Sequence, residues 1–178
     1  MKALVMLMMG WFLVGHATAQ LQEKRISPLD VATYQYKDAY AKVMYSRPSK
    51  NNREIFGKLV PYGQVWRTGA NEATEITLTR DVVIQGKTIL AGTYSLFTVP
   101  RETNWTIILN KEVGQWGAYN YNEKQDAGRW NVSVVKTPEK SVEVFTISFE
   151  NKNNIANLLI CWDDVCITLP IQFNEPKP

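Results

Sequence analysis

Two stretches of the sequence gather side chains that could bind a ligand, and the first lies between Tyr62 and Glu72. Its members are Tyr62, Trp66, Arg67, Asn71 and Glu72. Arg67 offers a rigid fork of hydrogen-bond donors, Asn71 offers both a donor and an acceptor, and the rings offer flat faces for stacking. This mixture suits a ligand rich in hydroxyl or carboxylate groups. The structural alternative is that Arg67 pairs with Glu72 to hold an irregular loop, while Trp66 and Tyr62 close one end of the fold.

The second stretch follows Leu109, where the alternation of apolar residues stops and a loop interrupted by Gly114 and Gly117 begins. Large aromatic side chains in a loop either bind a partner or cover a core. Rings stacked on sugar faces beside amides that meet hydroxyl groups would make a carbohydrate site, whereas the same side chains folded inward would plug the fold. Both interpretations stay open. The candidate ligand-binding residues here are Asn110, Gln115, Trp116 and Tyr121.

Basic residues are concentrated just before and within the first stretch. Between Lys42 and Arg67 the only acidic residue is Glu54. Such a bias favours an anionic ligand, for example an acidic glycan or a carboxylate. The alternative is a solvated basic face that acids elsewhere in the fold compensate. The basic residues of this segment are Lys42, Arg47, Lys50, Arg53, Lys58 and Arg67.

Any catalysis has to be assigned without histidine, because the only one, His16, lies in a segment that resembles an export signal. Ser-His-Asp and Cys-His catalysis and histidine-ligated metals are therefore excluded for the rest of the chain, and we predict neither a metal site nor a cofactor. Acid-base chemistry would fall to carboxylates, with Glu72 as the candidate catalytic residue. If Arg67 lies beside Glu72, it lowers the pKa of that carboxyl, which does not suit a general acid. The candidate partner carboxylates are Glu75, Asp81 and Asp126.

The first 19 residues have the pattern of a secretory signal peptide. Lys2 supplies a positive charge, residues 3–14 form an apolar run, and Ala17-Thr18-Ala19 fits the small-x-small cleavage pattern. We predict cleavage before Gln20 and a mature protein in the periplasm or the medium. The apolar run is shorter than the roughly 20 residues that a membrane helix needs, and no second long run follows, so no membrane span is expected after cleavage.

Length and charge limit what the mature chain can be. The chain of 178 residues, less this segment, is enough for one domain, which we place at residues 20–173. Residues 174–178 contain two prolines and charged side chains and are expected to form a disordered tail. A formal net charge of +3 is too low for a protein held to nucleic acid by counterion release, so nucleic acid is not an expected partner. The sequence does not specify an oligomeric state.

Short segments of alternating apolar residues recur along the chain, and turn signals such as Gln85-Gly86 and Ala91-Gly92 separate them. We therefore predict an all-β fold, a single antiparallel β-sandwich or jelly-roll-like domain of about ten short strands, with a closed barrel as the second choice. One short helical turn is expected near residues 53–57, where Gly57 could end it. The expected strands span 31–36, 40–46, 74–80, 82–84, 93–99, 105–109, 130–135, 142–149, 157–162 and 165–171.

The two cysteines, Cys161 and Cys166, lie in what the alternation of apolar residues predicts to be two arms of a hairpin. With Asp163 and Asp164 as its tip, the cysteines face each other with Cα atoms ~4.5 Å apart, within reach of a disulfide. An exported compartment favours that bond over a metal site. A redox-active role is the weaker alternative, because the spacing is not Cys-x-x-Cys.

Four segments carry a resemblance to a known family. They are REIFGKLVPYGQVWRTGANEAT, GTYSLFTVP, WTIILNK and QWGAYNY. On these motifs the chain resembles, from about Arg25 to Phe173, the exported bacterial family catalogued as domain of unknown function 2911. The resemblance implies export and a single domain, and it supplies no catalytic residue.

The leading hypothesis is an exported, non-catalytic module that binds a small molecule or carbohydrate through its two aromatic-amide loops. A glycan or a small anionic ligand would be the partner. One alternative is a histidine-free, glycosidase-like hydrolase that uses Glu72 and a second carboxylate. The other is a structural envelope-interaction protein whose loops pack inward. Whether the loops 61–72 and 110–121 form one cleft decides among these possibilities.

Overall fold

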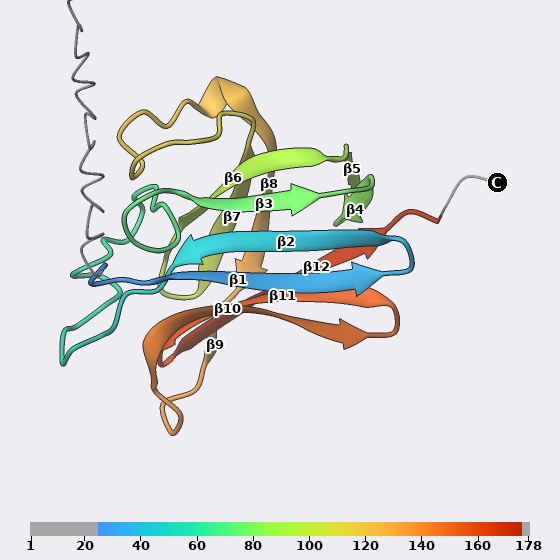
Figure 1. Cartoon of the computed structure of the whole chain (residues 1–178). Helices are drawn as coiled ribbons and strands as arrows, with labels where there is room; N and C mark the ends of the chain where they lie inside the picture. Colours follow the sequence, from blue (N-terminus) through green and yellow to red (C-terminus); the bar gives the residue numbers. More distant parts are fainter. Residues whose placement is uncertain (1–24, 176–178) are drawn as a thin grey trace, which may run out of the picture.

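The computed structural model of the chain describes residues 25–175. The predicted signal segment 1–19, its cleavage point before Gln20 and the last three residues of the predicted tail lie outside the described residues. Residues 25–175 form two antiparallel β-sheets and one 3-10 turn, with no closed barrel (Figure 1). The predicted all-β, sandwich-like architecture is therefore confirmed.

The first sheet has the strand order β1-β2-β3-β6-β7-β8, and each strand is antiparallel to its neighbours. The interior position of β7, between β6 and β8, agrees with its sequence, because Trp105 and Ile107 to Leu109 are apolar on both faces and all are buried. The strands are β1 Leu29–Tyr36, β2 Ala39–Ser46, β3 Thr74–Leu78, β6 Gly92–Val99, β7 Asn104–Asn110 and β8 Asp126–Ser133.

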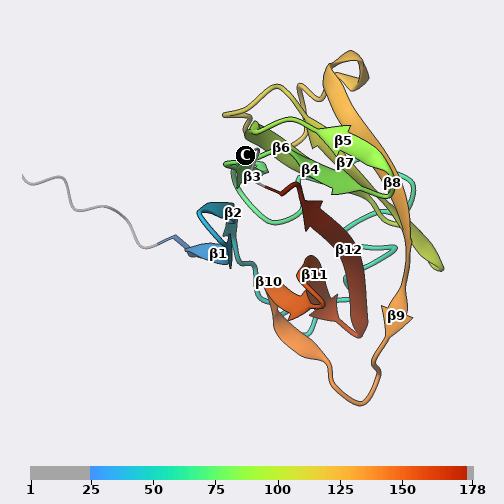
Figure 2. The same ribbon diagram turned by 90° about the vertical axis from the view of Figure 1, so that its right-hand side faces the viewer.

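The second sheet has the order β10-β11-β12-β4-β5, and the short strand β9 pairs with β12 beside this path. The chain crosses from the first sheet to the second between β3 and β4 and returns between β5 and β6. Figure 2 shows β1 and β2 on one side of the molecule, β8 and β9 on the other, and β10 to β12 between them. The strands are β4 Val82–Ile84, β5 Lys87–Ile89, β9 Val135–Lys136, β10 Val142–Lys152, β11 Ile155–Asp163 and β12 Val165–Phe173.

Alternating side chains of the two sheets fill one shared core. Phe145 and Ile147 of β10 are buried and Phe149 is partly buried on the same face, as their period of two predicts. At one end of the sandwich the core becomes strongly aromatic, and Trp105, Phe145 and Trp162 are all less than 3% exposed there. Large rings bury much apolar surface each, so this end of the fold depends on aromatic packing.

The helical turn expected at residues 53–57 does not form. Instead the backbone N–H of Val60 donates to the carbonyl of Ile55, and Gly57 donates back to the carbonyl of Val60, both at 2.9 Å. This non-helical loop turns the side chains of Ile55 and Val60 into the core, and that burial outweighs the local capping signal. The helical turn of the described chain is instead Glu123–Gln125, where the Asn122 side chain caps the Lys124 N–H.

Two strands, β5 and β9, were not expected from the sequence. In β5 only Ile89 is buried, and both residues of β9 are exposed, so neither strand shows the apolar alternation on which the expectation rests. The strand β5 forms by local hairpin pairing with β4 across the turn Gln85-Gly86, whereas β9 forms by tertiary pairing with Val165 and Cys166 of β12.

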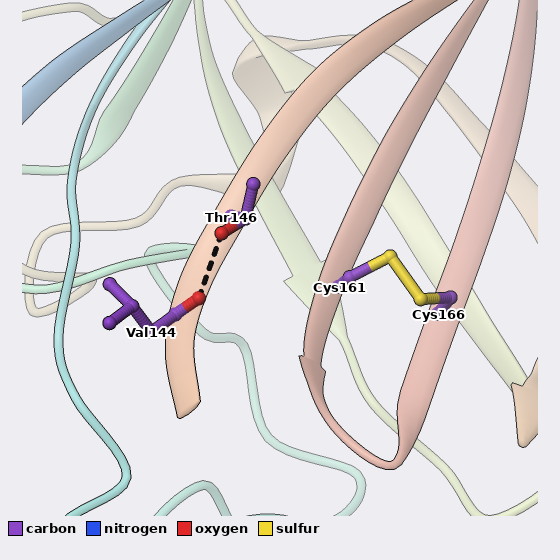
Figure 3. The surroundings of a disulfide bond; sticks show 4 residues. All are labelled: Val144, Thr146, Cys161 and Cys166. Atoms are coloured by element: carbon purple, nitrogen blue, oxygen red, sulfur yellow. Dashed lines mark hydrogen bonds between the residues drawn. A yellow bond between two sulfur atoms is a disulfide. The ribbon is translucent and has the colours of Figure 1, made fainter. Parts of the chain in front are cut away.

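The hairpin β11–β12 has the predicted form. Cys161 and Cys166 are partners in the strand register, as are Trp162 and Val165, and the tip is Asp163-Asp164. A disulfide joins the two cysteines, with their Cα atoms 4.2 Å apart. Figure 3 shows it crossing between the two strands, next to Thr146 of β10, which is the register partner of Cys161. The predicted disulfide is confirmed, and it cross-links two strands that are already paired by backbone hydrogen bonds.

The long connection from β2 to β3, residues 47–73, lies at the end of the sandwich where β2 ends and β10 begins (Figure 1). It is anchored there by a bridge between Ser49 and Val144 and by the hydrogen bond from Phe145 N–H to the carbonyl of Pro48, at 2.9 Å. The connection contains the whole first candidate stretch, so this end of the fold positions those side chains.

Candidate functional site

Trp66 is the residue around which the connection is built. Its backbone pairs with Thr98 of β6, through hydrogen bonds of 2.7 and 3.0 Å. Its side chain is 8% exposed and stacks on Trp162 with ring centroids 6.0 Å apart and planes at 15°. Phe145 meets the same ring edge-on at 5.2 Å. Trp66 therefore belongs mainly to the aromatic core, as the structural alternative expects for it.

Beside Trp66 the structure contains a cavity of about 270 Å³, which we call the arginine cavity. Its lining residues include Trp66 and Trp162, and two cationic residues, Arg53 and Arg67, also line it. None of its lining residues is an aspartate or a glutamate. Its lining residues are Ile26, Ser27, Pro48, Ser49, Asn51, Arg53, Leu59, Val60, Trp66, Arg67, Gly69, Ala70 and Trp162.

The two arginines of the cavity differ in how their donors are used. Arg53 is tied to the backbone, since its Nε donates to the carbonyl of Lys50 at 2.9 Å and its Nη2 to the carbonyl of Ser49. Arg67 is half-buried, its Nε is buried without a hydrogen-bond partner, and it forms no salt bridge with any group in residues 25–175. A buried donor without a partner costs free energy, so a hydrogen-bond acceptor placed at the Nε of Arg67 would stabilise the protein.

Glu72 does not pair with Arg67; that expectation is wrong. Its carboxylate instead accepts two hydrogen bonds from Arg25, at 2.7 and 2.8 Å. The hydrogen bonds and charge of Arg25 hold the pKa of Glu72 below its usual value. Arg25 stands just before β1, outside the stretch in which the sequence suggested a partner, and only the fold brings it to Glu72.

The backbone that follows Trp66 is strained at residues 68–71. Thr68, Gly69 and Asn71 all have positive φ angles, of 57°, 153° and 59°. A β-branched residue such as Thr68 rarely adopts this conformation, and it persists only where the surroundings enforce it. Here Thr74 Oγ1 donates to the Thr68 carbonyl at 2.6 Å, and the hydroxyls of Thr68 and Thr98 are 3.1 Å apart. Strain of this kind is concentrated at functional sites.

The two candidate loops meet through their backbones. Ala73 N–H donates to the carbonyl of Gln115 at 2.9 Å, Gly117 N–H donates to the carbonyl of Asn71 at 3.0 Å, and Glu72 and Trp116 form a β-bridge. Their aromatic side chains do not converge, because Trp66 is buried whereas Trp116 is 61% exposed and is not among the residues that line the arginine cavity. The backbone contact therefore does not create a cleft shared by Trp66 and Trp116.

Asn110 and Tyr121 take part in a polar network inside the second loop. Asn110 is fully buried, and its amide donates to the carbonyl of Asn122 and to Asp126 at 2.9 and 2.8 Å. The Tyr121 hydroxyl donates to Asp126 at 2.7 Å, and Arg129 completes the network at 3.0 Å from the same carboxylate. Burial and the contact with Asp126 raise the pKa of Tyr121. These groups are used within the protein and hold the loop in place.

The remaining candidates lie outside the arginine cavity. Asn71 donates long hydrogen bonds of 3.4 Å to the Ser27 carbonyl and the Ser46 hydroxyl, and the Gln115 amide donates to the Glu112 carbonyl. Tyr62 lines a separate cavity of about 490 Å³ near the tip of the β11–β12 hairpin. Of the nine candidate ligand-binding residues, Trp66 and Arg67 are the ones that line the arginine cavity.

Sequence reasoning did not propose Trp162, Arg53, Ile26 or Ala70 as site residues. Arg53 belongs to the basic segment that favours an anionic ligand, but nothing in the sequence distinguishes it from Lys58 of the same segment. Trp162 lies nearly one hundred positions from Trp66, and only the hairpin tip of the second sheet brings it to the cavity.

Within residues 25–175 no three His, Cys, Asp or Glu side chains are grouped closely enough to hold a metal ion. In the same range no helix is long and apolar enough to cross a membrane.

Comparison with known proteins supports the resemblance seen in the motifs. No curated protein and no solved structure matches the chain. One family model does match, and it covers residues 27–171, which include both sheets except for the last two residues of β12, and the arginine cavity except for Ile26. The chain therefore belongs to the family described as Protein of unknown function (DUF2911).

Proposed function

We propose that the protein is an exported, non-catalytic binding module that holds a small anionic molecule in the arginine cavity. The observation that carries this proposal is the state of Arg67: it lines a cavity without acidic residues, its buried Nε has no partner, and no carboxylate within residues 25–175 pairs with it. An anionic group of a ligand would supply the missing acceptor. A charge-assisted hydrogen bond of this kind is roughly twice as strong as a neutral one.

The surroundings of Arg67 support binding rather than a purely structural role. Arg53 adds a second positive charge whose position is fixed by backbone carbonyls, so little entropy is lost when an anion approaches. Leu59, Val60 and Ala70 are apolar lining residues of the cavity, and the nearly buried Trp66 and Trp162 lie beside them. A pocket with apolar walls and a few convergent polar groups is the usual form of a small-molecule site.

Export is part of the proposal. The disulfide Cys161–Cys166 is compatible with an oxidising compartment outside the cytosol. The signal-like pattern of residues 1–19 supports the same location, with cleavage before Gln20. Mass spectrometry of the protein isolated from the periplasm or the medium tests this part, since the proposal requires a mature chain that begins at Gln20.

Titration calorimetry of the mature chain against a panel of small carboxylates, uronic acids and phosphates tests the proposed site. The account expects at least one anion to bind, and Arg67→Gln to weaken that binding by roughly 10- to 100-fold, because one charge-assisted contact is lost. Lys42→Gln is the matched control, since it removes one positive charge from an exposed position of β2 outside the cavity. Equal effects of the two variants would show non-specific attraction and reject the proposed site.

A second candidate function, glycan binding at the surface, is favoured by two rings of the second loop. Trp116 is 61% exposed and Tyr119 is 83% exposed, and the Tyr119 ring covers Gly117. Exposed flat rings can stack on sugar faces. Screening of wild type and Trp116→Ala on a glycan array tests this candidate: binding lost in the variant supports it, and unchanged binding rejects it.

The glycosidase-like alternative is not proposed. It needs a carboxylic acid whose pKa is raised toward the working pH, and Arg25 lowers the pKa of Glu72. It also needs a second carboxylate at a fixed separation, and no such acid accompanies Glu72 in the small cavity that Glu72 lines.

A further inference from the structure

We infer that the anion held in the arginine cavity is a small phosphate monoester in its dianionic form. This inference rests on the proposed function and names the chemical class of its ligand. It distinguishes a phosphate ester from a monocarboxylate or a sugar acid, which the proposed function leaves open. Two features of the cavity carry it: its positive charges lack an acidic partner, and several of its side-chain donors lack a protein acceptor.

The arginine cavity is lined by two positively charged residues and by no negatively charged one. These residues are Arg53, which backbone carbonyls hold in place, and Arg67. Neither forms a salt bridge with any group in residues 25–175. A monocarboxylate or a sugar acid balances one of the two charges, whereas a phosphate monoester carries a charge of about −1.5 to −2 at pH 7 and can balance both. Charge matching therefore favours the dianion.

The donors at the cavity exceed what a single carboxylate can use. The buried Nε of Arg67 has no partner, and Arg53 gives two of its N–H groups to backbone carbonyls and keeps the others. Within residues 25–175, Ser27, Ser49 and Asn51 make hydrogen bonds through backbone atoms only, so their hydroxyl and amide groups remain available to a ligand. One guanidinium satisfies the two oxygens of a carboxylate in a bidentate pair. A phosphate group has three strong acceptor oxygens and uses this set of donors more fully.

The rest of the lining fits a small ester better than inorganic phosphate. Leu59, Val60 and Ala70 are apolar lining residues that can contact the carbon atoms of an esterified alcohol. The volume of the cavity, about 270 Å³, lies just below the range of roughly 300–1,000 Å³ that is usual for ligand pockets. A phosphate group on a short carbon skeleton matches this scale, whereas inorganic phosphate leaves the apolar residues without a contact.

The ionisation of the ligand provides a test that no histidine of the protein disturbs. The second pKa of a phosphate monoester is about 6, so lowering the pH from 7 to 5 converts most of the dianion to the monoanion. Apart from His16 in the signal-like segment, the chain contains no histidine, the side chain whose ordinary pKa lies in this range. Beside the cavity, Glu143 accepts a hydrogen bond from the backbone N–H of Asn51 at 2.8 Å. Sulfate and glycerate keep their charges over this range, so their binding records any contribution from Glu143 or another carboxylate.

Titration calorimetry of the mature chain with four probes tests the inference: glycerol 3-phosphate, glycerate, glucuronate and sulfate. At pH 7, glycerol 3-phosphate should bind at least about tenfold more tightly than the two carboxylates, because it meets both positive charges. Between pH 7 and pH 5 its affinity should fall about tenfold more than the affinities of sulfate and glycerate. Arg53→Gln removes one of the two charges and should remove most of the preference for glycerol 3-phosphate over glycerate. Lys42→Gln should leave that preference unchanged.

The outcomes separate this inference from the proposed function. If glycerate or glucuronate binds as tightly as glycerol 3-phosphate and Arg67→Gln abolishes that binding, the ligand class is wrong and the proposed anion site stands. An equal change with pH for glycerol 3-phosphate, sulfate and glycerate also rejects the dianion. If no anion of the wider panel binds through Arg67, the proposed function fails and the inference fails with it. Thermal unfolding is the folding control for each variant, and the comparison at two pH values uses the wild type, so it stays decisive if Arg53→Gln fails to fold.

Discussion

Arg67 differs from three other arginines near this end of the molecule, each of which has a partner within the protein. Arg25 holds Glu72, Arg47 contacts Asp30 and the Phe145 carbonyl, and Arg53 holds two backbone carbonyls. A half-buried cation kept without a partner lowers stability, and proteins commonly retain such costs where function requires them. The account therefore assigns Arg67 to a ligand and these three arginines to the fold.

Replacing Arg67 by methionine should separate stability from binding. Arg67→Met removes the buried N–H that lacks a partner and keeps an unbranched chain against Trp66, so we expect the free energy of unfolding to rise by about 1 kcal/mol. Urea denaturation measures this change. Arg53→Met is the control and should lower stability by about 1–2 kcal/mol, because it breaks two hydrogen bonds to carbonyls. Equal losses in both variants would show that Arg67 is structural.

Gly69 is the position where the cavity wall depends most on glycine. A Cβ there would lie 2.9 Å from the Ser46 carbonyl oxygen, and the φ angle of 153° disfavours any other residue. Gly69→Ala should therefore lower the free energy of unfolding by at least about 2 kcal/mol through strain and overpacking. Gly86→Ala is the control: it shares the positive φ, at 82°, but meets no atom within 4 Å, so it should cost only about 1 kcal/mol. Thermal denaturation distinguishes the two, and an equal effect would contradict the close approach.

At the scale of single residues, sequence reasoning identified Trp66 and Arg67 because their side-chain types carry obvious chemistry. It assigned Glu72 the wrong arginine, because Arg67 is the nearer of the two in sequence and Arg25 reaches Glu72 only through the packing of the segment before β1. It could not single out Asn110 as buried, since an amide at the end of a strand is equally compatible with a loop surface. Burial of a polar residue depends on partners, here Asp126, that are distant in sequence.

Among the elements, the β11–β12 hairpin brings Trp162 to the cavity. The disulfide joins Cys161 and Cys166, the register pair next to Trp162 and Val165. The double variant Cys161→Ser, Cys166→Ser should lower the free energy of unfolding by only about 2 kcal/mol, because the bond closes a very short loop. The cross-strand register on both sides of the tip should keep Trp162 in place, so ligand affinity should stay the same. Denaturation and calorimetry measure the two quantities. A large loss of affinity in the folded variant would show that the disulfide positions the cavity wall.

The ion pair between Arg25 and Glu72 ties the segment before β1 to the end of the long connection. The pKa of Glu72 is lowered in the folded protein, so the pair contributes stability above the carboxyl's usual value of 4.5 and loses it as the pH falls through the lowered pKa. Both side chains are 41% exposed, so solvent screens the pair and its contribution to stability is small. Denaturation between pH 6 and 3 should show a smaller acid-induced loss in Glu72→Gln than in wild type. Parallel curves for the two proteins would contradict the assignment.

Elements with strong apolar alternation were predictable, and short strands with few buried side chains were not. The hairpin β11–β12 and the strand β7 follow directly from their apolar patterns. The strand β5 buries one side chain and could not be recognised. The expected helical turn near residues 53–57 was a local capping signal, and the burial of Ile55 and Val60 overrode it.

Over the whole molecule, the site exists because the sandwich brings together segments that are far apart in the chain. Ile26 precedes β1, Trp66 and Arg67 belong to the connection between β2 and β3, and Trp162 lies near the tip of the last hairpin. Composition and periodicity predicted two sheets but not which loops meet, because the order of strands within a sheet is set by the packing of the whole chain. The arginine cavity was therefore beyond sequence reasoning even though two of its residues were named.

The most direct test of the central claim observes the side chain of Arg67 while a carboxylate is added. The Nε–H resonances of the arginines can be followed by nitrogen-15 NMR in the mature chain, and the Arg67 signal is identified by its absence from Arg67→Gln. The account predicts that a small carboxylate that binds in calorimetry shifts this signal in a saturable way and leaves the Arg25 signal unchanged. The contradicting result is an unmoved Arg67 signal while the indole N–H of Trp116 shifts, which would place binding on the exposed loop instead of in the cavity.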